Sequence, residues 1–167
     1  TSDDHEELIV RPRDIQDNAT PSGNAMAATA LLKLAGLAVE PRYVDLAEEA
    51  LAGVHRFLGQ FPLGFGQWLV ALAYALSGSR EIAIVGAPGA ADTQALVETA
   101  TAGFRPHQVV AVGDAGQEVA AVPLLADRPA VDGPSGQGKQ ATAYVCQNFA
   151  CQAPVTEPRA LQALLDG

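Results

Sequence analysis

The sequence has little positive charge and no long apolar run. Ten lysines and arginines stand against 19 aspartates and glutamates in 167 residues, which gives a formal net charge of -9. A protein that follows the phosphates of a nucleic acid needs a clustered basic face, so we expect no nucleic-acid partner. Every apolar stretch is shorter than the roughly 20 residues that cross a bilayer, so we expect no membrane association.

Cysteine is also scarce, since Cys146 and Cys151 are the only two, too few for a scaffold built from disulfides. The opening residues, Thr1 to Glu7, are polar and acidic and lack the basic and apolar regions of a secretory signal. No methionine opens the chain. These features predict a cytoplasmic protein cut from a longer one. Hydrophobic residues, at 49%, are sufficient for a packed core.

Apolar residues recur at helical spacing in the first half of the chain. The pattern predicts three helices, at about 22–37, 41–60 and 66–77. The third is apolar nearly all round and is therefore expected to be buried. The many alanines predict close helix crossings, as in layered helical hairpins.

The pattern changes near Arg80. Short apolar runs at 81–86, 107–113 and 141–147 predict strands, and residues 92–102 and 157–165 predict helices. A strand, a helix and a strand in succession favour a parallel pair with a right-handed crossover. We therefore predict a mixed fold of two domains. Residues 1–79 form helical hairpins, and residues 80–167 form a small α/β lobe with a three-stranded, mostly parallel sheet.

Two glycine-rich segments resemble phosphate-binding loops. Gly133 to Gln140 nearly matches the P-loop pattern, but Gln140 replaces the magnesium-binding Ser or Thr, and a strand follows instead of a helix. Gly86 to Ala91 has the better context, between a strand and a helix, yet it lacks the full glycine order and Pro88 removes a donor. Asp114 could imitate a ribose-binding acid. We predict a surface loop and a plain βα turn, and no cofactor.

A polar cluster precedes the first helix and is the richest in the chain, running from Asp17 to Asn24. One interpretation is that these residues only cap the helix. Capping needs one such side chain, so the alternative is that the remainder face a ligand. Gln67 and Trp68 open the third helix, and a Trp beside an amide is a common sugar-stacking pair, although a core position is the alternative. The candidate ligand-binding residues are Asn18, Ser22, Asn24, Gln67 and Trp68.

The two cysteines are separated by four residues, which matches neither a redox C-x-x-C nor a zinc site. The histidines show no ligand spacing, so we expect no metal site. The first interpretation is a reduced pair flanking a turn after the third strand. The alternative is a disulfide or a redox-responsive element that uses Cys146 and Cys151.

Three segments together resemble a known family. Residues 14–35, 64–86 and 143–158 are similar, in the same order, to the C-terminal part of the YyaL-like, spermatogenesis-associated thioredoxin-domain proteins. The resemblance implies a longer protein, with an N-terminal thioredoxin-like domain and an (α/α) toroid of six hairpins that this chain closes. It also implies a carbohydrate-active or sugar-binding toroid. The loop from Gly133 to Lys139 departs from the family pattern.

The resemblance leaves three hypotheses for function. In the first, the toroid binds or processes a sugar, with Asp17 as the catalytic carboxylate at its mouth. A glycosidase needs two carboxylates, so the chain alone is expected to be inactive. In the second, the chain is a non-catalytic structural or docking module. In the third, the cysteines respond to redox conditions. The expected partners are the missing N-terminal portion of the same polypeptide, a sugar ligand, and a second copy in a homo-oligomer.

Overall fold

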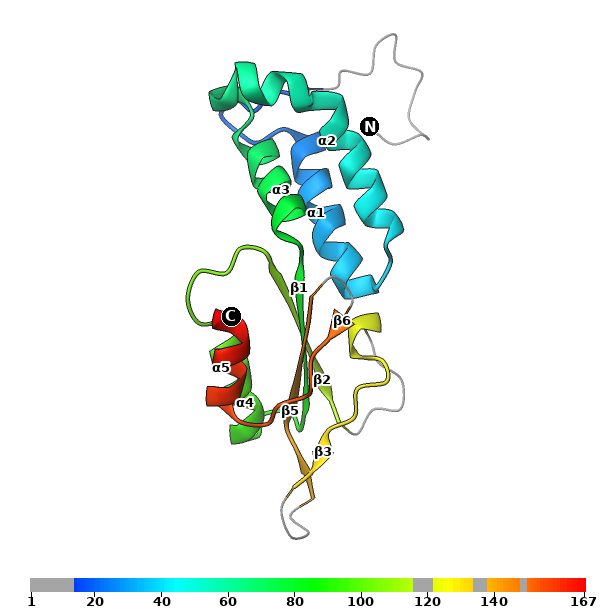
Figure 1. The fold of residues 1–167 in the computed structure, drawn as a ribbon, viewed down its shortest axis with the longest axis vertical. Coiled ribbons are helices and arrows are strands. Elements are labelled where there is room, and N and C mark those ends of the chain that lie inside the picture. Colours follow the sequence, from blue (N-terminus) through cyan, green and yellow to red (C-terminus); the bar gives the residue numbers. More distant parts are fainter. Residues whose placement is uncertain (1–13, 116–121, 134–137, 148–149) are drawn as a thin grey trace.

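The computed structural model describes residues 14–115, 122–133, 138–147 and 150–167. Its first group of elements is a helical layer, and its second is an α/β part that lies beyond one end of these helices (Figure 1). The helical layer holds α1 (Gly23–Ala38), α2 (Arg42–Gln60), the 3-10 turn η1 (Pro62–Gly64) and α3 (Gly66–Ser77). The α/β part holds β1 (Arg80–Gly86), α4 (Ala91–Thr101), β2 (Gln108–Asp114), η2 (Pro123–Leu125), β3 (Val131–Asp132), β4 (Lys139–Gln140), β5 (Thr142–Gln147), β6 (Ala150–Cys151) and α5 (Pro158–Asp166).

The helices of the first layer pack through small side chains. Ala25, Ala28, Ala47 and Ala71 are each at most 1% exposed. A methyl group keeps neighbouring helix axes close, and the larger side chains fill the space beside these contacts. Those side chains include Leu32, Leu51, Val54, Leu58, Phe65 and Trp68. The three helices predicted from the sequence are confirmed, with bounds that differ by at most one residue at each end.

The main sheet has the strand order β2-β1-β5-β6 in the described part of the chain. Strands β1 and β2 are parallel, with Ile82 opposite Val110, and helix α4 forms the crossover between them. Strand β5 lies on the other side of β1 and is antiparallel to it, and β6 is antiparallel to β5. A separate two-stranded sheet pairs β3 with β4.

The mixed fold class is confirmed. The prediction of a three-stranded, mostly parallel sheet was wrong in the number of strands and in their relative directions. Thr142, which starts β5, pairs with Val85 near the end of β1. Strand β5 therefore begins at the end of the sheet where β1 terminates. A parallel β5 would need a crossover helix that returns the chain to the other end of the sheet. The described residues between β2 and β5 contain no such helix, so β5 runs antiparallel.

Strand β1 is buried on both faces. On one face Ile82 and Ile84 pack with Leu96 of α4 and Leu161 of α5. Figure 1 shows these two helices side by side on that face of the sheet. On the other face Ala83 and Val85 pack with a second set of side chains, which also includes one from helix α1. These are Leu37, Val109, Ala111, Leu124, Leu125 and Ala130.

Leu37, the α1 side chain in this set, packs against the sheet and so connects the helical layer to it. The domain division at residues 79 and 80 stays a prediction. The loop expected around 127–140 contains the β3–β4 pair, and residues 134–137 at its centre lie outside the described residues.

We predict opposite effects for two glycine-to-alanine substitutions. A Cβ on Gly86 would stand 2.3 Å from the Thr93 hydroxyl oxygen and 2.9 Å from the Ala141 Cβ, so Gly86→Ala should destabilise the fold by about 1–3 kcal/mol. A Cβ on Gly53, inside α2, would meet nothing within 4 Å, so Gly53→Ala should stabilise the fold by about 0.5–1 kcal/mol. Urea unfolding measures both. A Gly86→Ala protein as stable as Gly53→Ala would contradict the tight packing of β1 against α4.

Candidate functional site

The predicted catalytic carboxylate, Asp17, joins the beginnings of two helices. Its Oδ1 accepts the Ser22 amide at 2.8 Å, and its Oδ2 accepts the Gln67 amide at 2.7 Å. Its own amide donates to the carbonyl oxygen of Gly64 at 2.8 Å. Ser22 precedes α1 and Gln67 lies in the first turn of α3. The carboxylate thus satisfies main-chain donors that the first turn of a helix leaves without partners.

The remaining polar residues of this cluster divide into caps and exposed groups. Ser22 is 4% exposed, and its hydroxyl accepts the Ala25 amide at 3.1 Å, which makes it the cap of α1. Asn24 is exposed and donates from Nδ2 to the carbonyl oxygen of Asp14 at 3.2 Å. Asn18 is exposed beside them. The sequence reasoning therefore identified a true cluster, and Asn18 and Asn24 are its solvent-facing amides.

Gln67 and Trp68 reach the same cluster from α3. Gln67 donates from Nε2 to the Thr29 hydroxyl of α1 at 2.9 Å. Trp68 is 2% exposed and donates from Nε1 to the carbonyl oxygen of Ile15 at 2.8 Å. The prediction that Trp68 stacks on a sugar ring needs an exposed ring face, which this side chain does not have. The core alternative describes Trp68, because the indole fills the space where the three helices meet.

The sequence analysis missed two members of this cluster. Thr29 and Ile15 contribute a hydroxyl and a main-chain carbonyl. Thr29 sits among small residues of α1 without a distinguishing pattern, and a carbonyl carries no side-chain signature. Only the excess of polar residues from Asp17 to Asn24 could have pointed to them.

The turn after β1 opens onto a cavity of about 440 Å³, which lies between the ends of β1 and β2 and the start of α4. Its lining includes Gly86, Thr93, Val97 and Asp114. Asp92, next to this lining, occupies the first turn of α4, where a phosphate would bind in a nucleotide site. Its carboxylate accepts the Ala141 amide at 2.9 Å and the Thr93 amide at 2.8 Å, which places a negative charge there. The geometry agrees with a plain βα turn.

The near-match to a P-loop lies in the hairpin of β3 and β4. Lys139, which holds the place of the phosphate-binding lysine, forms an ion pair with Asp132 at 2.8 Å on the exposed surface. Gly138 has a φ of +85°, which fits a turn in the hairpin. The four residues between Gly133 and Gly138 are outside the described part of the chain.

Cys146 and Cys151 form a disulfide, so the expectation of a reduced pair was wrong. The two residues stand directly opposite one another in the β5–β6 ladder, with 3.8 Å between their Cα atoms. The sequence analysis placed the two cysteines on either side of a turn after the third strand, but it did not predict that the segment after this turn would pair with the strand. The disulfide alternative describes the pair.

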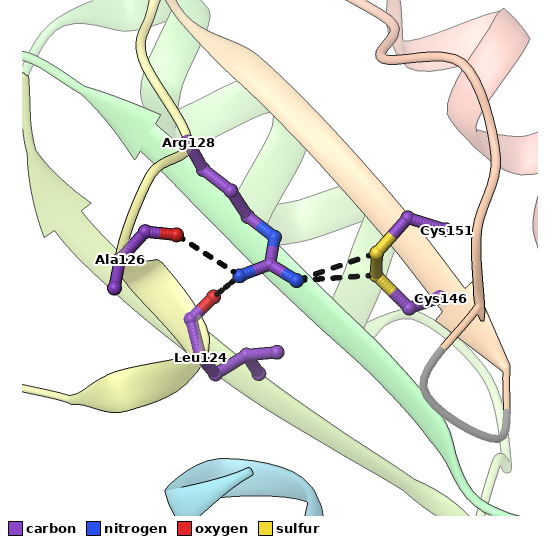
Figure 2. Close-up of a disulfide and its surroundings, with 5 residues drawn as sticks. All are labelled: Leu124, Ala126, Arg128, Cys146 and Cys151. Atoms are coloured by element: carbon purple, nitrogen blue, oxygen red, sulfur yellow. Dashed lines mark hydrogen bonds between the residues drawn. A yellow bond between two sulfur atoms is a disulfide. The ribbon is translucent and has the colours of Figure 1, made fainter.

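Charged and polar side chains surround this disulfide. Arg128 donates from Nη2 towards both sulfur atoms, at 3.6 Å from Sγ of Cys146 and 3.3 Å from Sγ of Cys151 (Figure 2). Glu81, only 1% exposed, stands opposite Cys146 in the β1–β5 ladder. Burial and the nearby charge of Glu81 raise the pKa of Tyr74 to about 12. Glu81 thus lies close enough to Tyr74 to affect its phenol, while it stands beside Cys146 in the sheet.

The described residues contain no group of three or more His, Cys, Asp or Glu side chains placed to hold a metal ion.

Among the helices that the structure describes, none combines the length and the apolar character needed to cross a membrane.

The comparisons with known proteins find relatives that are much longer than this chain. Spermatogenesis-associated protein 20 of Homo sapiens is 30% identical over 161 residues, and the protein of the same name from Rattus norvegicus is 29% identical over 162 residues. Each match covers 95% of this chain and 20% of the relative. An uncharacterized protein of Caenorhabditis elegans is 25% identical over 166 residues, which is 96% of this chain and 21% of the relative.

The resemblance to the spermatogenesis-associated family is therefore confirmed by similarity along almost the whole chain. The chain spans about a fifth of the length of the curated relatives it matches, so it is homologous to part of a larger protein. No family model and no solved structure matches the chain.

Replacement of Asp17 should destabilise the helical layer. Asp17→Ala leaves the amides of Ser22 and Gln67 without their charged acceptor, and we expect a loss of about 2–3 kcal/mol in the free energy of unfolding. Glu49→Ala removes an exposed carboxylate from α2 and should change stability by less than about 0.5 kcal/mol. Urea unfolding followed by circular dichroism compares the two. If Asp17→Ala were as stable as the control variant, the structural role assigned to Asp17 would be contradicted.

The carboxylate of Asp92 should make stability depend on pH. The Ala141 amide first, and then the Thr93 amide, hold the pKa of Asp92 below its ordinary value of 3.8. A lowered pKa contributes stability above the unfolded value, and this contribution is lost as the pH falls through the folded value. Asp92→Asn should therefore be less stable than the natural protein at neutral pH, and the gap should close in acid.

Urea midpoints measured from about pH 7 to about pH 2 test this dependence. Glu49→Gln, at an exposed position, is the control and should show no such convergence. A gap between Asp92→Asn and the natural protein that stays constant across the range would contradict the assignment.

Proposed function

We propose that this chain is a non-catalytic segment of a longer protein, in which its helical layer completes an (α/α) toroid. The rest of that toroid would come from the preceding part of the same polypeptide. The proposal follows the similarity to relatives about five times as long, together with one feature of the helical layer. That feature is an apolar surface along α2 and α3 that the described residues of the chain leave uncovered.

The uncovered surface is a groove of about 530 Å³ between α2 and α3. Leu51, His55 and Leu58 line it from α2, and Leu69 and Leu72 line it from α3. Leu76, four residues after Leu72 on the same helix face, continues the row and is 79% exposed.

Val70 of α3 is 49% exposed as well, so α3 presents apolar side chains on more than one face. A helix that is apolar nearly all round is normally covered on all sides. A neighbouring helical hairpin of the same polypeptide would bury this row against its own apolar face.

The geometry of Asp17 supports a structural role over a catalytic one. Both carboxylate oxygens accept main-chain amides at 2.7–2.8 Å, and these bonds fix the beginnings of α1 and α3 relative to each other. A general acid or a nucleophile must direct an oxygen at the substrate. The cluster around Asp17 therefore serves to hold the helices at the mouth of the proposed toroid.

The carbohydrate hypothesis applies to the whole protein. Asn18 lies before α1 and Asn24 lies in its first turn, and their exposed side chains could contact the hydroxyl groups of a sugar held by the assembled toroid. The acid and base of any reaction would then come from the preceding hairpins. Binding of a monosaccharide by the longer protein, measured by calorimetry and weakened in Asn24→Ala, would support this extension.

Self-association of the chain tests the groove. Uncovered apolar surface of this kind favours association, so we expect a dimer or larger species by light scattering at tens of micromolar. Leu76→Lys should shift the chain towards the monomer, because a charge then interrupts the apolar row. The control is Phe104→Lys, which replaces a side chain that is 91% exposed after α4, in the α/β part. This control should leave association unchanged.

A clean monomer of the natural chain would count against the groove as an interface. A second experiment introduces the same two substitutions into the longer protein and compares the melting temperatures of the variants. There Leu76→Lys should lower the melting temperature, since the row would be buried, while Phe104→Lys should not. Equal melting temperatures for the two variants would contradict the proposed packing.

A further inference from the structure

The disulfide between Cys146 and Cys151 joins the last two strands of the main sheet, β5 and β6, and neither cysteine lines the helical groove. Its two ends differ in exposure, because Cys146 is 1% exposed while Cys151 is exposed on β6, the last strand in the order. We propose that this disulfide is a thiol–disulfide exchange site that accepts two electrons from a dithiol reductant. The inference goes beyond the proposed structural function and does not depend on it.

The difference in exposure sets the direction of the reaction. A thiolate attacks one sulfur of a disulfide and expels the other along the same axis. Cys151 is exposed to solvent, whereas Cys146 is 1% exposed. Cys151 is therefore the sulfur that is attacked, and Cys146 is the leaving group.

Arg128 supplies the charge that this leaving group needs. Its Nη1 donates to the carbonyl oxygens of Leu124 and Ala126, which fixes the guanidinium with Nη2 at 3.6 Å from Sγ of Cys146 and 3.3 Å from Sγ of Cys151 (Figure 2). A cation beside a sulfur stabilises the thiolate. Leaving groups that form a more stable thiolate depart faster, so Arg128 is placed to accelerate reduction.

A purely structural bridge would give less reason for this arrangement. The disulfide closes a loop with a sequence separation of only five, and its two residues already pair in the β5–β6 ladder. The stabilisation from cross-linking grows with loop length, so this disulfide should stabilise the fold less than most disulfides do. The cross-link itself does not require a guanidinium beside its sulfurs, yet Arg128 places Nη2 near both of them.

The exchange balances in two steps. In the first, a thiolate of the dithiol forms a bond to Sγ of Cys151, the Cys146–Cys151 bond breaks, and its electron pair stays on Sγ of Cys146 beside Arg128. In the second, the other sulfur of the reductant, after losing its proton to solvent, attacks the reductant sulfur of the mixed disulfide and releases Cys151 as a thiolate. The two cysteines take up protons from water. The reductant becomes a disulfide, and the chain gains two electrons and two protons.

Rates of reduction by dithiothreitol test the role of Arg128. We measure them by quenching with N-ethylmaleimide and mass spectrometry, with the full chain in its folded state. Arg128→Gln should slow reduction about tenfold, because the leaving thiolate loses its adjacent charge. Arg128→Lys should restore most of the rate. The matched control, Arg105→Gln, breaks an ion pair with Asp166 at 2.9 Å and should react like the natural protein.

Trapping with glutathione disulfide tests the direction of attack and does not depend on Arg128. In the reduced single variants, Cys151 of Cys146→Ser should form a mixed disulfide at least about tenfold faster than Cys146 of Cys151→Ser, because a buried thiol is shielded. Equal rates for Arg128→Gln and Arg105→Gln would overturn the proposal. Faster trapping at Cys146 would overturn it too, as would cysteines that stay free thiols in air.

Discussion

Strand β1 ties the molecule together because both of its edges and both of its faces are occupied. Strand β2 pairs with one edge and β5 with the other, while α4 and α5 cover one face. The opposite face meets the end of α1 through Leu37 and buries Glu81. A Cβ added to Gly36 would stand 3.0 Å from Cγ of Glu81, so the helix approaches the strand as closely as a glycine allows. The position of the helical layer on the sheet follows from this contact.

The secondary structure could be predicted well from the sequence because each element carries its own local pattern. The helical stripes of α1, α2 and α3, and the apolar runs of β1, β2 and β5, are visible without any partner. The direction of β5 could not be predicted in this way. Its residues would suit a parallel or an antiparallel neighbour equally. The direction depends only on the end of β1 at which Thr142 joins the sheet.

The polar cluster before α1 was predictable as a cluster, whereas its chemistry was not. An excess of short polar residues marks Asp17 to Asn24, yet the partner that defines the role of Asp17 is the main-chain amide of Gln67, 50 residues away. Every residue except proline has such an amide, so sequence cannot single it out. The disulfide shows the same limit, since Arg128 lies 18 positions before Cys146 and 23 positions before Cys151, without a local motif.

The bonds of Ile15 and Asp17 also determine the order in which the helical layer assembles. Their partners on α3 lie 53 and 50 residues away, and the entropy of closing so long a loop must be offset before these contacts can form. Helices α1 and α2 contact each other over a much shorter stretch of chain and can pair first. The segment before α1 therefore completes its contacts only after α3 has arrived, although Asp14 and Asp17 also bond residues at the start of α1. The amides of Ser22 and Gln67 share one carboxylate, so a displacement of that single side chain exposes the starts of two helices that lie far apart in the sequence.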